Sequence, residues 1–420
     1  MSKLALLGGR PVTKDLLAKS SLVRRGDLER EYLLEAYDSG IWDDWPHNTQ
    51  SQAAKFAREW ARFQNAKHCV LLTNGTHTLQ VALEALDIGA GDEVLVPGVT
   101  WQATAATVVD VNAVTVFVDV DPTTMCIDVE KAEAAVTPRT RAIMPVHLYH
   151  RMADMDRIKR LAKKHSLFII EDAAHAHGSR WGKSGSGTLG DFGSFSFQSF
   201  KLITGAEGGA LLTQNEELFH KANSQRICGR DSGGFRVHNG NYRITSFSAA
   251  VLRGQLAAFR KNAPLIDRRG RALDKAVDAA PGTKALRRHR MITRQCSYQF
   301  AFLYDKQAFD GVSGDTFRKA LSAELGVLFH ACQAPLSHSS VYYPHTKKRH
   351  QWSKSYLKAI TPSRWDLPVA DELWKDSSVL TGWRILGCTA DAPKKLTEAI
   401  GRLHDNREQL LDYDKQAQQA

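Results

Sequence analysis

Two residues of opposite charge stand just after apolar runs, where a folded chain would hold them in a cleft. Asp172 follows the run Leu167–Ile170, and Lys201 follows the aromatic segment Phe195–Phe200. A carboxylate at the end of a buried strand points toward the site face of an α/β sheet. An amine withdrawn from water has a pKa below about 10.4, which frees its nucleophilic form. Taken singly, Asp172 could cap a helix and Lys201 could lie on the surface.

Two further segments supply a predicted anion-binding turn, called the cradle below, and an aromatic side chain for stacking, called the plate. The run Cys69–Thr73 leads into Asn74-Gly75-Thr76, which opens a predicted helix whose N-terminal amides and Thr hydroxyl can bind a phosphate. Trp101 follows the apolar run Val94–Pro97 and can stack on a flat heterocycle. Taken alone, the first segment could be a plain helix cap, and Trp101 could pack in the core.

Together the cradle, plate, carboxylate and amine match one cofactor, pyridoxal 5′-phosphate. Its phosphate needs the helix end, its ring the Trp, its ring nitrogen an acid, and its aldehyde a lysine that forms a Schiff base. A competing phosphate motif fails on context. Gly185–Gly190 fits G-x-G-x-x-G but precedes a strand, whereas a dinucleotide fingerprint precedes a helix. We therefore interpret it as a turn.

The predicted elements alternate along the first two thirds of the chain, which favours an α/β fold with a mostly parallel sheet. The expected domains are a large one over residues 1–275 and a smaller C-terminal α+β domain over 276–420. A weak basic helix is expected within 265–290, and a strand at Gln299–Tyr304. Seven strands are predicted in the large domain: Cys69–Thr73, Glu93–Val96, Thr115–Val118, Ala142–Val146, Leu167–Ile170, Gly193–Phe197 and Gly209–Thr213. Helices are predicted at Thr76–Leu86, Gln102–Val111 and Met155–His165.

Composition excludes several other classes of protein. The 420 residues are 43% hydrophobic and 24% charged, as in a folded globular chain, and no run is long enough to span a membrane. The net charge of +11 comes partly from short clusters at 268–271, 287–290 and 347–349, which suit a solvated basic face better than a nucleic-acid site. Six scattered cysteines without a C-x-x-C pair predict free thiols in the cytoplasm and disfavour a metal site.

In combination, these motifs resemble the sugar and cyclitol aminotransferases within the fold-type I enzymes that use pyridoxal phosphate. The resemblance runs over nearly the whole chain, from Gly8-Gly9-Arg10-Pro11 to the last helix. It rests on a set of short motifs: Asn74-Gly75-Thr76, Val146-His147-Leu148, Asp172–Gly178, Gly190–Gly193, Phe195–Lys201, Glu207-Gly208-Gly209 and Asn241–Leu256.

The resemblance implies a role for each matching residue. Lys201 would form the Schiff base and move the proton, and Asp172 would pair with the pyridine nitrogen. His175, where many relatives have Gln, would lie near the ring hydroxyl, and Trp101 would stack on the ring. Gly75, Thr76 and Ser196 would hold the phosphate. Asn241 would reach in from a second subunit, which implies a homodimer. Apart from the resemblance, the guanidinium of Arg243 matches the geometry of a donor carboxylate, and a structural salt bridge is the alternative for this residue.

The second half of the chain narrows the substrate. The segments 335–350 and 362–368 resemble the branch that aminates scyllo-inosose or its 2-deoxy form with L-glutamine. The chain departs from that branch at Thr381-Gly382-Trp383-Arg384, where a His pair is usual, so the acceptor or donor could differ. Two alternatives stay open: a dehydratase like 3-amino-5-hydroxybenzoate synthase, and a catalytically silent regulatory protein. Sugar dehydrases and 3,4-ketoisomerase-type relatives of the resembled family have His at the Schiff-base position, so Lys201 in this chain favours transamination over those reactions.

Overall fold

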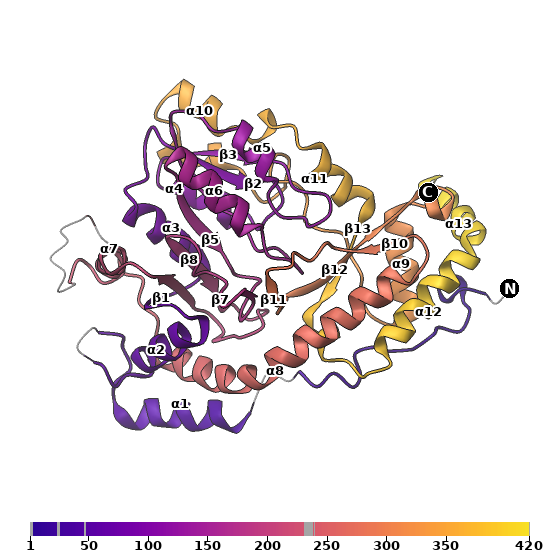
Figure 1. Cartoon of the computed structure of the whole chain (residues 1–420), viewed down its shortest axis with the longest axis horizontal. Helices are drawn as coiled ribbons and strands as arrows, with labels where there is room; N and C mark the ends of the chain where they lie inside the picture. The colour runs from indigo at the N-terminus through magenta and orange to yellow at the C-terminus, as the bar shows by residue number, and fades with distance from the viewer. Residues whose placement is uncertain (1–2, 23–25, 46–47, 231–237, 239, 420) are drawn as a thin grey trace.

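A seven-stranded sheet forms the centre of the larger part of the molecule (Figure 1). This computed structural model describes residues 3–22, 26–45, 48–230, 238 and 240–419. The strand order is β1-β9-β8-β5-β4-β2-β3, and β9 is the one strand that runs antiparallel to its neighbours. The bounds are β1 (His68–Leu72), β2 (Glu93–Pro97), β3 (Val114–Val118), β4 (Thr140–Ile143), β5 (Phe168–Asp172), β8 (Phe192–Ser196) and β9 (Gly209–Thr213).

Helices alternate with these strands, as the sequence predicts. Side chains cap several of their N-termini: Asn74 accepts a hydrogen bond from the amide of His77 at the start of α3, and Asp154 caps α6 in the same way. Three basic residues in the last turn of α6 complement its dipole. The bounds in this part of the chain are α1 (Asp27–Ser39), α2 (Gln52–Gln64), α3 (Gly75–Ala85), α4 (Ala103–Asp110), α5 (Val129–Ala134), α6 (Met155–His165) and α7 (Glu216–Arg226).

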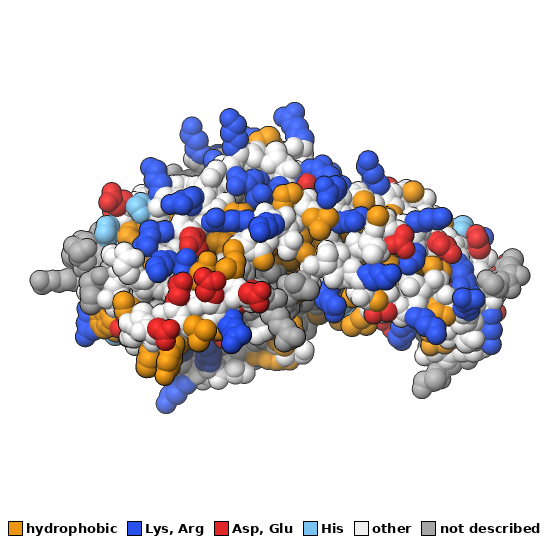
Figure 2. Space-filling view, turned by 90° about the horizontal axis from the view of Figure 1, so that it is seen from below, with side chains coloured by type: hydrophobic (Ala, Val, Ile, Leu, Met, Phe, Trp, Pro, Cys, Tyr) orange, Lys and Arg blue, Asp and Glu red, His pale blue; other side chains and the backbone are white. Residues whose placement is uncertain are grey.

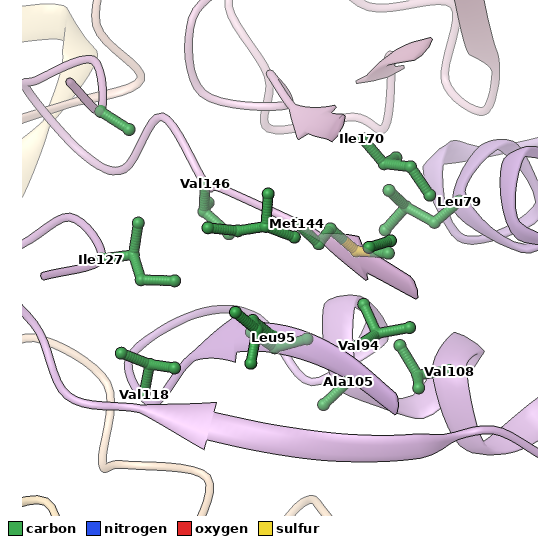
Figure 3. Close-up of a cluster of buried hydrophobic side chains, with 14 of the residues drawn as sticks. Leu79, Val94, Leu95, Ala105, Val108, Val118, Ile127, Met144, Val146 and Ile170 are labelled. Atoms are coloured by element: carbon green, nitrogen blue, oxygen red, sulfur yellow. The ribbon is translucent and has the colours of Figure 1, made fainter. Parts of the chain in front are cut away.

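The sheet is covered on both faces, which explains why its strands are continuous apolar runs. Every residue of β2 and β9 is buried. In Figure 3, side chains of β2 and β5, among them Val94 and Ile170, converge with Leu79 of α3 and with Met144, which follows β4. This core leaves the carboxyl ends of β1, β2, β5 and β8 on one edge of the sheet.

One helix is much longer than the sequence suggests. The weak basic helix expected within 265–290 is the second half of α8 (Ser246–Asp278), which is unbroken over 33 residues although it contains Pro264. A helix is present there as predicted, but its length was not predicted because Pro264 and several arginines interrupt the local pattern. Buried side chains such as Phe259, Ile266 and Leu273 keep the helix packed from α1 and α2 toward α12 (Figure 1).

A second, three-stranded antiparallel sheet lies beyond α8, with the order β10-β12-β13. Strand β12 coincides with the predicted strand Gln299–Tyr304. A small sheet of β11, β6 and β7 lies near the larger one. The remaining bounds are β6 (Arg180–Trp181), β7 (Ser184–Gly185), β10 (Thr283–Ala285), β11 (Ile292–Arg294), β12 (Gln299–Tyr304), β13 (Ser378–Gly382), α9 (Gly314–Leu325), α10 (Lys354–Ile360), α11 (Pro368–Glu372), α12 (Ala392–Asp405) and α13 (Arg407–Gln419).

The segment between α9 and β13 returns to the large sheet. The hydroxyl of Tyr356 donates to the carbonyl of Ala113, and Asp119 accepts from the amide of Ala370 at 2.9 Å. Tyr342 and Leu367 belong to the same apolar cluster as β2. The motifs of residues 335–368 thus lie against the large sheet, whereas Thr381 and Gly382 pair with β12.

Basic side chains are dispersed over the surface. On the face seen in Figure 2, Lys and Arg alternate with hydrophobic and acidic side chains instead of gathering in one stripe. Within the described ranges, no helix is both long and apolar enough to cross a membrane.

Candidate active site

A cavity of about 630 Å³ opens at the carboxyl edge of the large sheet. Its wall combines the turn after β1, the segment after β2, the ends of β5 and β8, and residues from β12 and from the segment after α9. The sequence-predicted residues in its lining are Gly75, Thr76, Trp101, Asp172, His175, Ser196 and Lys201. The topology brings these residues together because parallel strands share one carboxyl edge.

Asn241 and Arg243 lie outside the lining of this cavity. Asn241 is exposed and forms an isolated bridge with Ile227. The guanidinium of Arg243 lies 4.8 Å from the centre of the Trp45 ring. Within one chain, neither residue reaches the groups at the ends of β5 and β8.

Lys201 lies in a turn after β8, and its amide donates to the carbonyl of Gln198. Burial lowers the pKa of its ammonium to about 8, while the charge of Asp172 acts in the opposite direction. Its Nζ lies 4.5 Å from the centre of the Tyr298 ring. About a tenth of this amine is therefore unprotonated at pH 7, far more than for an ordinary lysine, and the unprotonated form is the nucleophile.

Asp172 ends β5 with its carboxylate almost wholly buried. Its Oδ2 accepts from the hydroxyl of Thr104 at 2.9 Å, and its Oδ1 accepts from the amide of Ala174 at 3.2 Å. Its backbone is fixed as well, because its amide donates to Pro145 and its carbonyl accepts from His147. This carboxylate is a rigid acceptor facing the cavity.

The N-terminus of α3 packs tightly against the end of β8. A Cβ on Gly75 would lie 2.7 Å from the Cβ of Ser196, so only glycine allows this approach. The buried Nε2 of His177 donates to the carbonyl of Ser196 at 2.8 Å. Burial and the charge of Lys201 lower the pKa of His177 to about 3, so the ring is neutral. The helix end, Thr76 and Ser196 form a cradle suited to a phosphate.

His175 and Tyr298 form an aromatic floor beside Lys201. Their ring centres are 4.4 Å apart, and the amide of Tyr298 donates to the carbonyl of His175. Burial and the charge of Lys201 lower the pKa of His175 well below its usual range. His175 is thus a neutral imidazole next to the amine.

Glu171, next to Asp172, occupies the glycine loop. Its fully buried carboxylate accepts from the amides of Gly187, Leu189 and Gly190, and lies 2.8 Å from Nε2 of His147. The amides of the G-x-G-x-x-G loop therefore bind a carboxylate of the protein and leave no place for a nucleotide. The structure agrees with the interpretation of this motif as a turn.

Several lining residues escaped the sequence analysis. Tyr149 follows β4, and the others come from the strand and loop segments beyond α8, where only the strand pattern of β12 gave any signal. They are Tyr149, Tyr298, Gln299, His330 and Gln333. Side chains of these types are common throughout folded proteins, so the sequence alone does not mark them. Their place in the lining of the cavity identifies them.

Pyridoxal phosphate fits these groups. Each part of the cofactor finds a partner in the cavity. The N-terminus of α3 suits the phosphate, and the exposed ring of Trp101 can stack on the pyridine ring. The buried carboxylate of Asp172 suits the ring nitrogen, and the amine of Lys201, whose pKa is lowered, suits the aldehyde. The described residues contain no cluster of three or more His, Cys, Asp or Glu side chains that could hold a metal ion. The fold and the site define a pyridoxal-phosphate-dependent aminotransferase.

The comparison with known families gives the same class. Residues 25–379 match the DegT/DnrJ/EryC1/StrS aminotransferase family, and the chain belongs to it. A 2-deoxy-scyllo-inosose aminotransferase of Streptomyces lividus that uses L-glutamine is 35% identical, with 89% of this chain and 91% of the relative covered. A Streptoalloteichus tenebrarius protein, 37% identical over 97% of this chain and 99% of its own length, carries a provisional name as an L-glutamine:3-amino-2,3-dideoxy-scyllo-inosose aminotransferase.

Solved structures share the fold over nearly the full length. The crystal structure of 3-amino-5-hydroxybenzoic acid synthase matches with a TM-score of 0.78 and 30% identity, covering 92% of this chain and 98% of that one. The structure of DesI in the presence of its TDP-sugar product matches with a TM-score of 0.77 and 25% identity over 98% of both chains. The predicted fold class, enzyme class and cofactor are confirmed.

Proposed function

We propose that this enzyme transfers the amino group of L-glutamine to a keto-cyclitol such as scyllo-inosose or its 2-deoxy form, in the biosynthesis of an aminocyclitol. One observation carries the proposal: relatives named for this type of donor and acceptor match the chain almost end to end. The resemblance of residues 335–350 and 362–368 to the same branch supports it.

The charges that one chain contributes to the cavity suit a free cyclitol better than a nucleotide-linked sugar. Among the described lining residues of one chain, Lys201 is the single Lys or Arg, and it serves the cofactor. A diphosphate group would call for further cations or for a second helix end. The rest of the wall has aromatic, aliphatic, hydroxyl, thiol, amide and acidic side chains, which suit a neutral polyhydroxylated ring.

The chain's own residues divide the chemistry among them. When bound, the cofactor supplies an aldehyde and an electron-withdrawing ring. Nζ of Lys201 would hold the cofactor through its aldehyde and would move a proton to and from the substrate carbon. The carboxylate of Asp172 holds the proton on the ring nitrogen, Gly75, Thr76 and Ser196 hold the phosphate, Trp101 covers the ring, and His175 lies near the ring hydroxyl.

A homodimer would complete this site. Trp101 is 53% exposed and Phe200 is 64% exposed, and both line the cavity. Large apolar side chains in such positions are typical of surfaces covered by a partner. Asn241, which lies outside the cavity of its own chain, would then reach the site of the second copy. The role of Arg243 toward a donor carboxylate is part of the same proposal.

Mixed dimers test the shared site. Chains with Lys201→Ala and chains with Asn241→Ala should each be impaired. Mixing them after mild dissociation should restore one intact site per heterodimer and recover part of the activity. Failure to recover activity, with heterodimers shown by native mass spectrometry, would mean that Asn241 serves its own chain.

A half-reaction panel tests the function itself. L-glutamine should bleach the absorbance band of the cofactor bound in the holoenzyme, and scyllo-inosose added afterwards should restore that band. A holoenzyme that reacts with L-glutamine but with no keto-cyclitol would refute the proposed acceptor class. Other amino donors serve as the comparison for the first step.

A second candidate is a dehydratase of the 3-amino-5-hydroxybenzoate type, since the structure of that synthase is among the matching folds. Product mass distinguishes the two: transamination conserves the ring hydroxyls, whereas the dehydratase releases water. Loss of water from an aminocyclohexane precursor, without net transfer of nitrogen, would favour the second candidate.

Two coarser features belong to the same proposal. The six thiols are all unpaired, which fits a reducing cytoplasm.

The division into domains of residues 1–275 and 276–420 would place the boundary near the end of α8. Limited proteolysis with mass mapping tests it, because cleavage should concentrate at exposed connections near that boundary.

A further inference from the structure

At the end of the cavity formed by residues from beyond α8, two side chains hold each other in place by a hydrogen bond. Gln299 begins β12, and His330 lies on the segment after α9; both line the cavity. The two are joined by a hydrogen bond of 3.1 Å between Nε2 of each residue. They come from segments 31 residues apart and meet across β13.

His330 is held in place on two sides. Its amide and carbonyl form a pair of hydrogen bonds with Leu380 of β13, at 2.9 and 2.8 Å. Its Nδ1 lies 2.8 Å from the carbonyl of Ala331. Because a carbonyl can only accept, Nδ1 carries a proton, and in the neutral imidazole Nε2 is left as an acceptor.

This arrangement orients the carboxamide of Gln299. Its Nε2 donates to His330, so its Oε1 is turned away from the ring. Within the part of the chain that the structure describes, this oxygen has no protein donor. Nearby in the lining, Oε1 of Gln333 is buried without a partner, and the hydroxyl of Tyr149 accepts from the amide of Gln333. Two amide oxygens therefore lack a hydrogen-bond donor at this end of the cavity.

We propose that Gln299, positioned by His330, selects a polyhydroxylated ring by accepting a hydrogen bond from one of its hydroxyls. This inference rests on the proposed keto-cyclitol acceptor and adds the group that recognises it. Ring hydroxyls donate protons to such acceptors, whereas a group that has no proton to donate, such as an ionised phosphate, would leave them unpaired. A site built to hydrogen-bond a hydroxyl discriminates strongly against ligands that lack it.

Three variants separate recognition from folding. Gln299→Met keeps the length of the side chain and removes the amide, and His330→Phe keeps a ring and removes its nitrogens. Gln351→Met is the matched control, since Gln351 is exposed and its amide donates to the carbonyl of His345, outside the cavity lining. Binding of scyllo-inositol, an unreactive polyol, to the holoenzyme is measured by calorimetry alongside both half-reactions.

Gln299→Met should raise the KM for scyllo-inosose and the Kd for scyllo-inositol roughly tenfold, with kcat nearly unchanged. The half-reaction with L-glutamine should change less than about threefold. His330→Phe should weaken the polyol severalfold but add nothing in a Gln299→Met background, because it acts through Gln299. Gln351→Met should match the wild type.

Equal losses in both half-reactions, additive effects of Gln299 and His330, or unchanged polyol binding in Gln299→Met would each overturn the inference. A wild-type enzyme that neither binds scyllo-inositol nor turns over a keto-cyclitol would instead refute the proposed function. The two failures are thus distinguishable.

Discussion

The two ends of the cavity are built in different ways. At the cofactor end, strand ends of one parallel sheet present Asp172, Ser196 and Lys201, backed by buried groups such as Glu171 and His177. At the opposite end, Gln299, His330 and Gln333 stand on segments that reach the sheet from beyond α8. The first end is set by the sheet itself, and the second by how later segments pack against it.

This difference separates chemistry from selection. Charged and strongly hydrogen-bonded groups at the cofactor end serve steps that every substrate shares, so changes there should affect both half-reactions. On the proposal made above, the neutral amides at the other end would contact the part of the acceptor that lies away from the reacting carbon. Substitutions at that end should distinguish acceptors while the cofactor stays in place.

The largest effect is expected at Lys201. Lys201→Ala removes the amine that attaches the cofactor and moves the proton, and both half-reactions should fall by roughly 10⁴-fold or more. Stopped-flow absorbance measures each half-reaction. Lys183→Ala, at an exposed lysine on the loop between β6 and β7, is the control and should retain activity. Retention of more than a few per cent of activity in Lys201→Ala would contradict the assignment of the shared chemistry to the cofactor end of the cavity.

Asp172→Asn should give the next largest loss. The amide keeps the shape of the side chain and can still accept from Thr104, but it has no negative charge to hold a proton on the ring nitrogen. We expect both half-reactions to slow by about 10²–10³-fold. If one half-reaction alone were affected, the division between shared chemistry and acceptor selection would be wrong at this residue.

Gly75→Ala should weaken cofactor binding. The added Cβ would lie 2.7 Å from Ser196, so the cradle must open. We expect about a tenfold higher dissociation constant for pyridoxal phosphate, measured by equilibrium dialysis. Gly401→Ala is the matched control, because a Cβ there meets nothing within 4 Å and α12 should be slightly stabilised. Equal cofactor affinity in the two variants would contradict the tight approach at Gly75.

The pH dependence of cofactor attachment should follow Lys201. With a pKa of about 8, the neutral amine of cofactor-free protein should increase about tenfold per pH unit up to pH 8 and level off above it. Attachment rates are measured against Nα-acetyl-lysine amide, whose ordinary pKa keeps its rate rising further. Because Asp172 raises the pKa of Lys201, Asp172→Asn should shift the profile to lower pH. An upward shift would reverse the assigned electrostatics.

The smallest effect is expected at Gln333. Its Oε1 is buried with no partner among the described residues, so Gln333→Met should leave the stability unchanged or raise it by up to about 1 kcal/mol. Thermal unfolding without substrate measures this change. A marked loss of stability would show that the amide is satisfied in the protein and would weaken the contrast between the two ends.

The sequence could place most of the proposed cofactor-binding residues at one edge of the sheet because the signals at this end of the cavity are local. Apolar runs ending in Asn74-Gly75, Trp101, Asp172 and Lys201 report a strand and its carboxyl end within a few residues. The parallel topology then brings those ends together. The same logic placed seven of the nine proposed site residues around one cavity.

The acceptor end could not be predicted in this way. Gln299 and His330 meet only because both segments pair with β13, in and beside the three-stranded sheet β10-β12-β13. The length of α8 was also missed, because its burial against α1, α2 and α12 outweighs the local effect of Pro264. Long-range packing, which leaves no period in the sequence, decides both features.

The central claim is that Nζ of Lys201 joins the cofactor. Reduction of the holoenzyme with borohydride, followed by proteolysis and mass spectrometry, tests it directly. We predict that one pyridoxyl group per chain is found on the peptide that contains residue 201. A fully loaded preparation in which the label lies on another lysine, or in which residue 201 is unmodified, would contradict the account.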